Sequence, residues 1–225
     1  MTRRRVFLAA GFAGLGVVAG MGCANPAASM YFLFRGDEKV PAEHPMPAKG
    51  DKKEITVAVL TSTGGSLPMD FAGVDRELGA LVGKAMVEAT KDDKHPVVIV
   101  EAGKVDKLKT APGRDWRTVP PADLGKQVAA DYVIDLTVAG ITIFAPEYGR
   151  EYYSGKADIQ VVVYDCTAKD AGPYRQYVHN GKYPTKSTEA MTPAGYRQVF
   201  LARLANEIAW RHVPHVADRA ISRKD

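Results

Sequence analysis

Residues 132–144, with the sequence YVIDLTVAGITIF, decide the fold of this chain. Ile134, Leu136 and Val138 fall on one face of an extended strand, because side chains alternate between the two faces with a period of two. Asp135 and Thr137 fall on the opposite face, which is therefore polar. The pattern predicts a long strand with one face in a core and the other toward solvent or a partner.

The segments after residue 144 predict antiparallel strands and then a helix. Residues 157–164 repeat the alternation after a short connection, so they must run antiparallel to the first strand, and residues 174–178 indicate a further short strand. Thr192 is suited to cap a last helix that has Pro193 at its first position. Its apolar stripe consists of Tyr196, Val199, Phe200, Leu204 and Ile208, with His212 as a further member.

The segments before residue 132 alternate between strand and helix patterns. Residues 55–60 (ITVAVL) form a β-branched run typical of a buried strand, and residues 97–100 (VVIV) form a second one. Between them, apolar residues recur over 74–89 at the spacing of an amphipathic helix. Residues 104–120 are polar and indicate irregular structure, and residues 122–129 predict a short helix.

The predicted order is therefore β-α-β-α-β-β-β-α, within one domain that spans residues 55–213 and is followed by a polar tail at 214–225. Strands joined through helices favour parallel, right-handed crossovers, whereas strands joined by short turns must be antiparallel. The fold class that follows is α/β in the broad sense (α+β), a mixed parallel and antiparallel sheet packed with helices.

Residues 1–22 have the three-part layout of a signal peptide. Arginines at positions 3–5 precede an apolar run at 6–19, and the small-residue patch 20–22 follows. That run has about 14 residues, whereas a helix needs roughly 20 to span a bilayer. An uncleaved membrane anchor remains an alternative, and residues 4–8 (RRVFL) also resemble a twin-arginine export signal.

Cys23 directly follows this leader, at the position where a bacterial lipoprotein is cut and lipidated. A thiol is required there because acylation begins with a thioether. Ala24 stands where an Asp would indicate retention in an inner membrane, so the outer membrane is favoured. Cys166 is the second of the chain's two cysteines, so a lipidated Cys23 leaves it no disulfide partner within the chain.

The charge of the chain lies mainly in the leader. Of 30 Lys and Arg residues three lie at positions 3–5, which leaves 27 in the remainder against 26 Asp and Glu residues. A nearly neutral body has no electrostatic footprint for nucleic acid. Residues 24–54 include a stretch rich in Pro, Lys and acids, which predicts a semi-extended tether between Cys23 and the domain.

Four short motifs resemble one group of periplasmic domains. They are residues 57–60 (VAVL), 124–126 (LGK), 130–134 (ADYVI) and 161–167 (VVVYDCT). The group comprises curli-secretion lipoproteins, penicillin-binding-protein activator lipoproteins and the amino-terminal domain of the Tol-Pal translocation protein. The resemblance spans roughly residues 55–212. It implies a domain that binds other envelope proteins or assembles, and it brings no catalytic residues.

Candidate chemical sites in the sequence are weak. Residues 61–66 (TSTGGS) lie between a strand and a helix, where backbone N–H groups could cradle a phosphate, but the Lys of a Walker loop does not follow. His212, His215 and Asp218 have a spacing compatible with metal ligands, but Pro214 interrupts the helix that would align them. We therefore expect no catalytic residues, no cofactor and no metal.

Four residues are candidates for contact with a partner. Tyr148, Arg150 and Tyr152 cluster at the tip between two predicted strands, and Trp116 lies in the polar segment 104–120. Tyr, Trp and Arg are favoured contact residues at protein interfaces.

The sequence thus predicts a non-catalytic, lipid-anchored envelope protein that binds, scaffolds or activates another envelope protein. Two alternatives stay open: an exported small-ligand or phosphate-binding protein or hydrolase, and a homo-oligomeric, self-assembling ring component.

Overall fold

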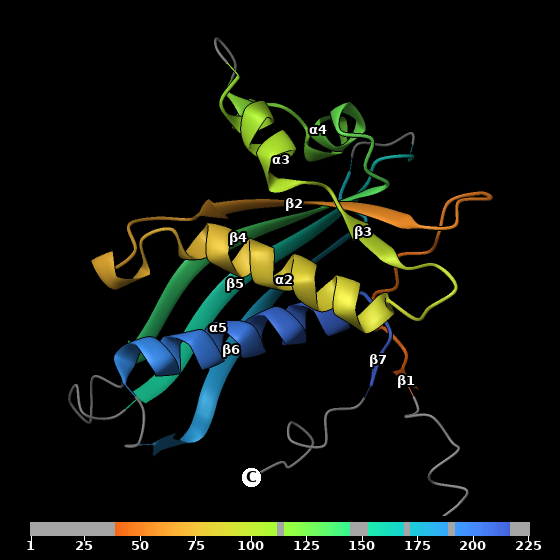
Figure 1. Ribbon diagram of the computed structural model, residues 1–225. Coiled ribbons are helices and arrows are strands. Elements are labelled where there is room, and N and C mark those ends of the chain that lie inside the picture. The colour runs from red at the N-terminus through yellow and green to blue at the C-terminus, as the bar shows by residue number, and fades with distance from the viewer. Residues whose placement is uncertain (1–38, 112–114, 145–152, 169–171, 189–191, 217–225) are drawn as a thin grey trace, which may run out of the picture. The chain divides into compact units, whose positions relative to one another are not determined.

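The computed structural model describes residues 39–111, 115–144, 153–168, 172–188 and 192–216. Its main sheet has five strands in the order β3-β2-β4-β5-β6, with β2 parallel to both neighbours and β4, β5 and β6 antiparallel (Figure 1). This confirms the predicted mixed α+β fold.

The strands are β1 (Lys39–Val40), β2 (Ile55–Thr63), β3 (Val97–Ile99), β4 (Tyr132–Phe144), β5 (Tyr153–Asp165), β6 (Arg175–Thr188) and β7 (His215–Val216). The helices are α2 (Val74–Thr90), α3 (Ala102–Lys109), α4 (Pro121–Gln127) and α5 (Pro193–Trp210), with single 3-10 turns η1 (Met69–Phe71) and η2 (Trp116–Thr118).

Helices α2 and α5 lie side by side on one face of the sheet and form the main core with it (Figure 1). Helix α2 buries Val74, Leu78, Val82 and Met86, so the predicted apolar spacing of four residues faces the strands. Helix α5 begins at the predicted cap, where the Thr192 hydroxyl accepts a hydrogen bond from the Gly195 amide at 3.2 Å.

The opposite face of the sheet is covered by α3 and α4 around β2 and the start of β4. Leu60 of β2, Val105 of α3, Leu124 of α4 and Val133 of β4 make a second, smaller core there. The prediction of irregular structure over 104–120 is wrong for residues 104–109, which belong to α3. Val105 alone is fully buried in this helix, so its sequence has little apolar periodicity, and packing against the sheet stabilises it.

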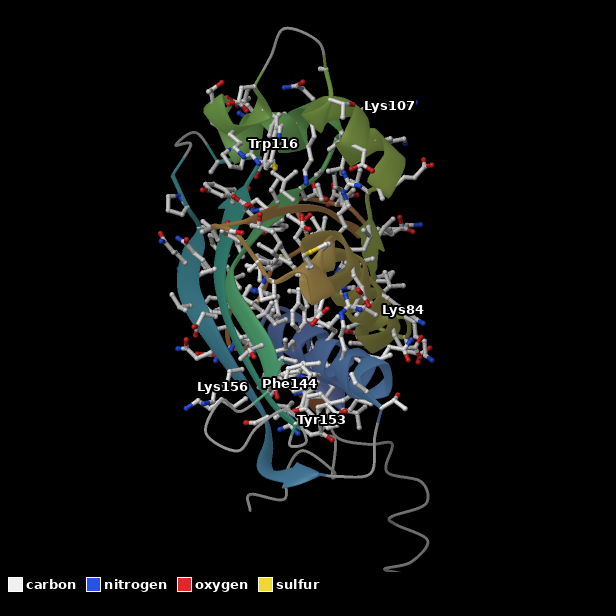
Figure 2. The ribbon with its side chains drawn as sticks, turned by 90° about the vertical axis from the view of Figure 1, so that its left-hand side faces the viewer. Lys84, Lys107, Trp116, Phe144, Tyr153 and Lys156 are labelled. Atoms are coloured by element: carbon white, nitrogen blue, oxygen red, sulfur yellow. The ribbon has the colours of Figure 1, made fainter. Side chains whose placement is uncertain are left out.

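Beyond this second core, no helix in the described ranges covers the outer face of β5 and β6. Asp158 and Gln160 on β5, and Asn180 and Lys182 on β6, are exposed, while their neighbours in each strand point into the main core. Figure 2 shows Lys156 of β5 directed away from α2 and α5. The polar face that the alternation predicted is present, and β6 is longer than the short strand expected at 174–178.

Residues 39–54, which composition predicted as part of a tether, are packed on the domain. The compact unit that contains the sheet begins at Lys39. Met46 is only 4% exposed and belongs to the main core. The Pro47 carbonyl accepts a hydrogen bond from the Tyr132 hydroxyl at 2.9 Å, and the Lys52 ammonium lies 2.5 Å from a carboxylate oxygen of Asp131. Residues 39–54 are too poor in apolar residues to form a core of their own. The buried Met46, together with hydrogen bonds and ion pairs to the domain, holds them in place.

His212 joins this segment to the end of α5. The imidazole is 1% exposed, and its Nε2 atom lies 2.9 Å from the Tyr177 hydroxyl. Its Nδ1 atom lies 3.3 Å from the His44 carbonyl, while the His44 amide donates to the Arg211 carbonyl at 2.6 Å. Burial lowers the pKa of His212 from its ordinary value near 6.5 to about 4, so the ring is neutral at pH 7.

Three of the motifs that carry the family resemblance converge beneath α4. The Gly125 carbonyl accepts hydrogen bonds from the amides of Val128 and Ala130. Asp131 accepts from the Thr56 amide through its side chain, at 2.9 Å, and from the Cys166 amide through its carbonyl, also at 2.9 Å. Residues 124–126, 130–134 and 161–167 therefore form one joint between helix and sheet.

Gly125→Ala is expected to destabilise the fold. A Cβ atom at this position would overlap the Cys166 sulfur and Cγ2 of Val133, which are both buried. Overpacking of this kind costs about 1–3 kcal/mol of unfolding free energy, measured by urea denaturation. The control is Gly103→Ala in α3, where the nearest atom would be 3.8 Å away and a stabilisation of up to about 1 kcal/mol is expected. Equal effects of the two substitutions would contradict the close packing at Gly125.

Stability is expected to fall between about pH 6.5 and pH 4 because of His212. In this window the His212 imidazole is protonated in the unfolded chain but stays neutral in the folded protein. Acidification therefore favours the unfolded state. The full loss is about 3 kcal/mol. His212→Gln should flatten the melting temperature in this window relative to the unmodified protein, whereas Tyr177→Phe, which keeps the imidazole, should preserve the slope. Parallel curves for the protein and His212→Gln would refute this assignment.

Candidate functional site

Trp116 is the one candidate contact residue that lies within the described ranges. Cys23, Tyr148, Arg150 and Tyr152 lie outside them. Figure 2 shows Trp116 at the end of the domain that α3 and α4 cover, and shows Phe144 and Tyr153 at the opposite end. Phe144 and Tyr153 therefore belong to a different surface from Trp116.

Trp116 begins the 3-10 turn η2, which short polar bonds fix. The Asp115 carboxylate accepts a hydrogen bond from the Arg117 amide at 3.0 Å, and the Asp115 carbonyl accepts one from the Thr118 hydroxyl at 2.7 Å. The indole ring is partly buried against the second core. Its accessible part lines a cavity of about 500 Å³.

The position of this cavity follows from the topology of the sheet. After β2 the chain crosses to the face that carries α2, and after β3 it crosses to the face that carries α3. Connections that leave neighbouring parallel strands in opposite directions open a crevice at the carboxyl ends of those strands, where α/β proteins bind ligands. The cavity lies at this point, between the end of β2, the segment 67–73, the start of α2 and the end of α3.

Cationic side chains dominate the charged part of the cavity wall. Arg76, Lys109 and Arg117 line it, against the single acid Asp75. Within the ranges that the structure describes, neither arginine forms an ion pair with an acid. The wall therefore has a surplus of positive charge, although the body of the protein is nearly neutral.

Lys109 occupies the centre of this arrangement. Its ammonium donates a hydrogen bond to the Thr61 carbonyl at 2.8 Å and lies 4.9 Å from the centroid of the Trp116 ring. The Arg117 guanidinium lies 5.2 Å from the same centroid. Burial lowers the pKa of Lys109, and the carboxylates of nearby acids, Asp75 first among them, oppose that shift. A partly buried ammonium with an incomplete set of acceptors is a favourable place for an anion.

A second cavity of about 290 Å³ shares Thr61, Arg76 and Lys109 with the first. The remainder of its wall is mainly apolar and includes Ala80, Ile99 and Val105. The two cavities together present a cationic compartment beside an apolar one.

Met69 lies in the segment that borders the larger cavity, and its side chain is 93% exposed. This side chain contributes no buried area to the core and is accessible to a partner. Trp116, Arg76 and Arg117 line the larger cavity, and Met69 lies between Leu67 and Phe71, which also line it. Aromatic residues, methionine and arginine are the residue types in which protein interfaces are enriched. We call Met69, Arg76, Trp116 and Arg117 the Trp116 surface.

The predicted phosphate loop is strand over its first half. Thr61, Ser62 and Thr63 continue β2 and pair in parallel with Leu136, Thr137 and Val138. The Gly64 amide donates to the Val138 carbonyl at 2.9 Å, so it is not available to a ligand. The expectation of a loop from residue 61 is therefore wrong, because a β-branched run with a parallel partner extends the sheet. Thr61–Thr63 still line the larger cavity with their side chains.

The remaining reactive residue types are in structural positions. His212 is buried as described, His215 stacks on Trp210 with ring centroids 4.6 Å apart, and Asp218 lies outside the described residues. Among the described residues no group of three or more His, Cys, Asp or Glu could hold a metal ion. Cys166 is buried, and burial raises the pKa of its thiol to about 11, which disfavours the nucleophilic thiolate.

Sequence reasoning identified Trp116 but missed Arg76, Lys109 and Met69. Arg76 lies on the polar face of a helix, and Lys109 is one of several lysines in a charged segment, so neither is distinctive in the sequence. A signal was available in the position of residues 61–76, a strand end followed by a helix start, which predicts a crevice once the strand order is known.

No model of a known protein family matches the sequence, and no curated protein matches it. Solved structures similar to this chain include the PelC dodecamer of Paraburkholderia phytofirmans, with 10% identity, coverage of 78% of this chain and 97% of PelC, and a TM-score of 0.45. The lipoprotein GNA1162 of Neisseria meningitidis has 11% identity, coverage of 69% and 98%, and a TM-score of 0.39. The C-terminal domain of LpoB from Salmonella enterica has 13% identity, coverage of 69% and 92%, and a TM-score of 0.29. Of these three proteins, GNA1162 is a lipoprotein.

Proposed function

We propose that this protein is a non-catalytic lipoprotein of the cell envelope that binds or scaffolds another envelope protein. The observation that carries the proposal is the Trp116 surface, which brings one aromatic ring, one almost fully exposed methionine and two arginines together around the larger cavity. Neither arginine pairs with an acid in the part of the chain that the structure describes. Such residues supply large contact area and charge-assisted hydrogen bonds to a partner.

The proposed anchor is an acyl chain on Cys23, because the leader, the small-residue patch and the cysteine follow one another as in lipoproteins. None of the helices in the described part of the chain has the length and apolarity to cross a membrane. We place the domain in the periplasm and favour the outer membrane, since Ala24 follows the cysteine.

Tyr148, Arg150 and Tyr152 remain a proposed second contact site. Phe144 and Tyr153, which flank the segment that contains them, lie at the opposite end of the domain from Trp116 (Figure 2). We propose that these three residues form a contact site separate from the Trp116 surface.

A second candidate function is an exported protein that binds a small anion, and the surplus of positive charge in the larger cavity favours it. A small anion that binds the folded state raises the melting temperature by mass action. A melting temperature unchanged by millimolar phosphate, nucleotide or dicarboxylate would remove this candidate.

Lipidation is expected to depend on Cys23. In the native host grown with labelled palmitate, the protein should carry label and partition into the membrane fraction, and Cys23→Ser should lose the label. Cys166→Ser is the matched control and should keep it, because that thiol is buried inside the domain. A mature product that retains residue 1, or label that survives Cys23→Ser, would contradict the anchor.

Partner capture is expected to depend on the Trp116 surface. After crosslinking in intact cells, Trp116→Ala combined with Met69→Ala should reduce the recovered partner at least tenfold, since truncation of an interface hot spot costs about 2 kcal/mol or more. Val178→Ala is the control, because Val178 is 57% exposed on the uncovered face of β6. Alanine at Tyr148, Arg150 and Tyr152 tests the second site on its own. If every partner remained bound both to the variant with Trp116→Ala and Met69→Ala and to the variant with alanine at Tyr148, Arg150 and Tyr152, the proposed function would be wrong.

A further inference from the structure

The two joined cavities constrain the chemistry of what binds there. Thr61, Arg76 and Lys109 belong to both walls, so a ligand group held by these side chains lies at the junction of the cationic and apolar compartments. A ligand that used both compartments would have an anionic group directly beside an apolar one.

The positive charge of the side chains at the junction favours the anionic end of such a ligand there. Arg76 and Lys109 stand there with Arg117 further out, and the acids on the two walls are Asp75 and Asp106. Arginine offers a planar pair of donors that suits a carboxylate, and a partly buried lysine gains from an anion that replaces lost hydration. The Trp116 ring lies beside Lys109 and Arg117 and forms part of the same wall.

The volume of the apolar cavity suits a single apolar side chain. The apolar cavity has a volume of about 290 Å³, close to that of about ten water molecules in the liquid. This is just below the range of about 300–1,000 Å³ typical of pockets for drug-sized ligands. It accommodates one large apolar side chain. A neighbouring cavity of about 340 Å³ shares Gly79, Ala80 and Ile99 with it, which leaves room for a longer apolar group.

We propose, building on the proposed function, that the partner docks through the C-terminal residue of its polypeptide chain. The terminal carboxylate is held by Arg76 and Lys109, and the apolar side chain of the same residue enters the cavity lined by Ala80, Ile99 and Val105. This residue is the anchor of the interface, and the Trp116 surface surrounds it.

The probe for this interaction is N-acetyl-L-leucine, which reproduces a C-terminal residue with an apolar side chain. The purified full-length protein carries Trp210→Phe, so that Trp116, the other of its two tryptophans, is the fluorescent reporter. N-acetyl-L-leucine should change this fluorescence in a saturable manner. N-acetyl-L-leucinamide, which lacks the carboxylate, and acetate, which lacks the side chain, should each bind at least tenfold more weakly.

Substitutions assign the carboxylate to its partners. Arg76→Gln and Lys109→Gln should each weaken binding of N-acetyl-L-leucine at least tenfold and leave binding of its amide unchanged. Lys107→Gln is the matched control for Lys109→Gln. Lys107 lies on α3 with Lys109 (Figure 2), its substitution removes the same charge, and it lines neither cavity. Arg76 is exposed on α2, so its substitution keeps the test valid if Lys109→Gln fails to fold.

Equal binding of the acid and the amide would overturn this proposal, and so would tighter binding of octanoate, which would assign the cavities to an acyl ligand. The proposed function fails separately. If Trp116→Ala abolishes partner capture while the acid and the amide bind alike, the function stands and the C-terminal anchor is wrong. If the acid is preferred but no partner depends on either proposed contact site, the function is wrong and the cavities bind free carboxylates.

Discussion

The parallel pairing of β2 with both β3 and β4 is the constraint on which the rest of the structure depends. Because parallel neighbours cannot be joined by tight turns, the chain must leave the sheet after β2 and again after β3. It leaves toward opposite faces, so that α2 lies on one side and α3 with α4 on the other. Both cores and the crevice between α2 and α3 follow from this arrangement. The antiparallel strands β5 and β6 extend the sheet and, with α5, complete the main core.

The large elements could be predicted from the sequence because each carries its own pattern. Residues 134–138 alternate between apolar and polar side chains, α2 repeats its apolar positions, and α5 begins with Thr192 and Pro193 at its cap. The structure has these elements where the pattern placed them. Helix α3 could not be predicted in this way, since Val105 is its one fully buried residue and its stability comes from tertiary contacts.

Most of the candidate site could not be predicted from the sequence, because its residues come together only in the folded sheet. Arg76 lies on a different helix from Lys109 and more than 30 residues from Lys109 and Trp116 in sequence, and no motif links the three residues. Their common location depends on the order of the strands, which short patterns do not encode. Trp116 could be predicted because its residue type is favoured at interfaces. Arg76 and Lys109 are recognised as its neighbours only when β2 and β3 are known to lie side by side.

The docking of residues 39–54 on the domain has a mechanical consequence for an anchored protein. If the chain is fixed at Cys23, only about 16 peptide units separate the anchor from Lys39, and even fully stretched they reach at most about 60 Å. A tether that continued to residue 54 would have nearly twice that reach. The search volume of the domain above the bilayer is correspondingly small, which raises the local concentration of any ligand held at the same leaflet and excludes ligands fixed farther away.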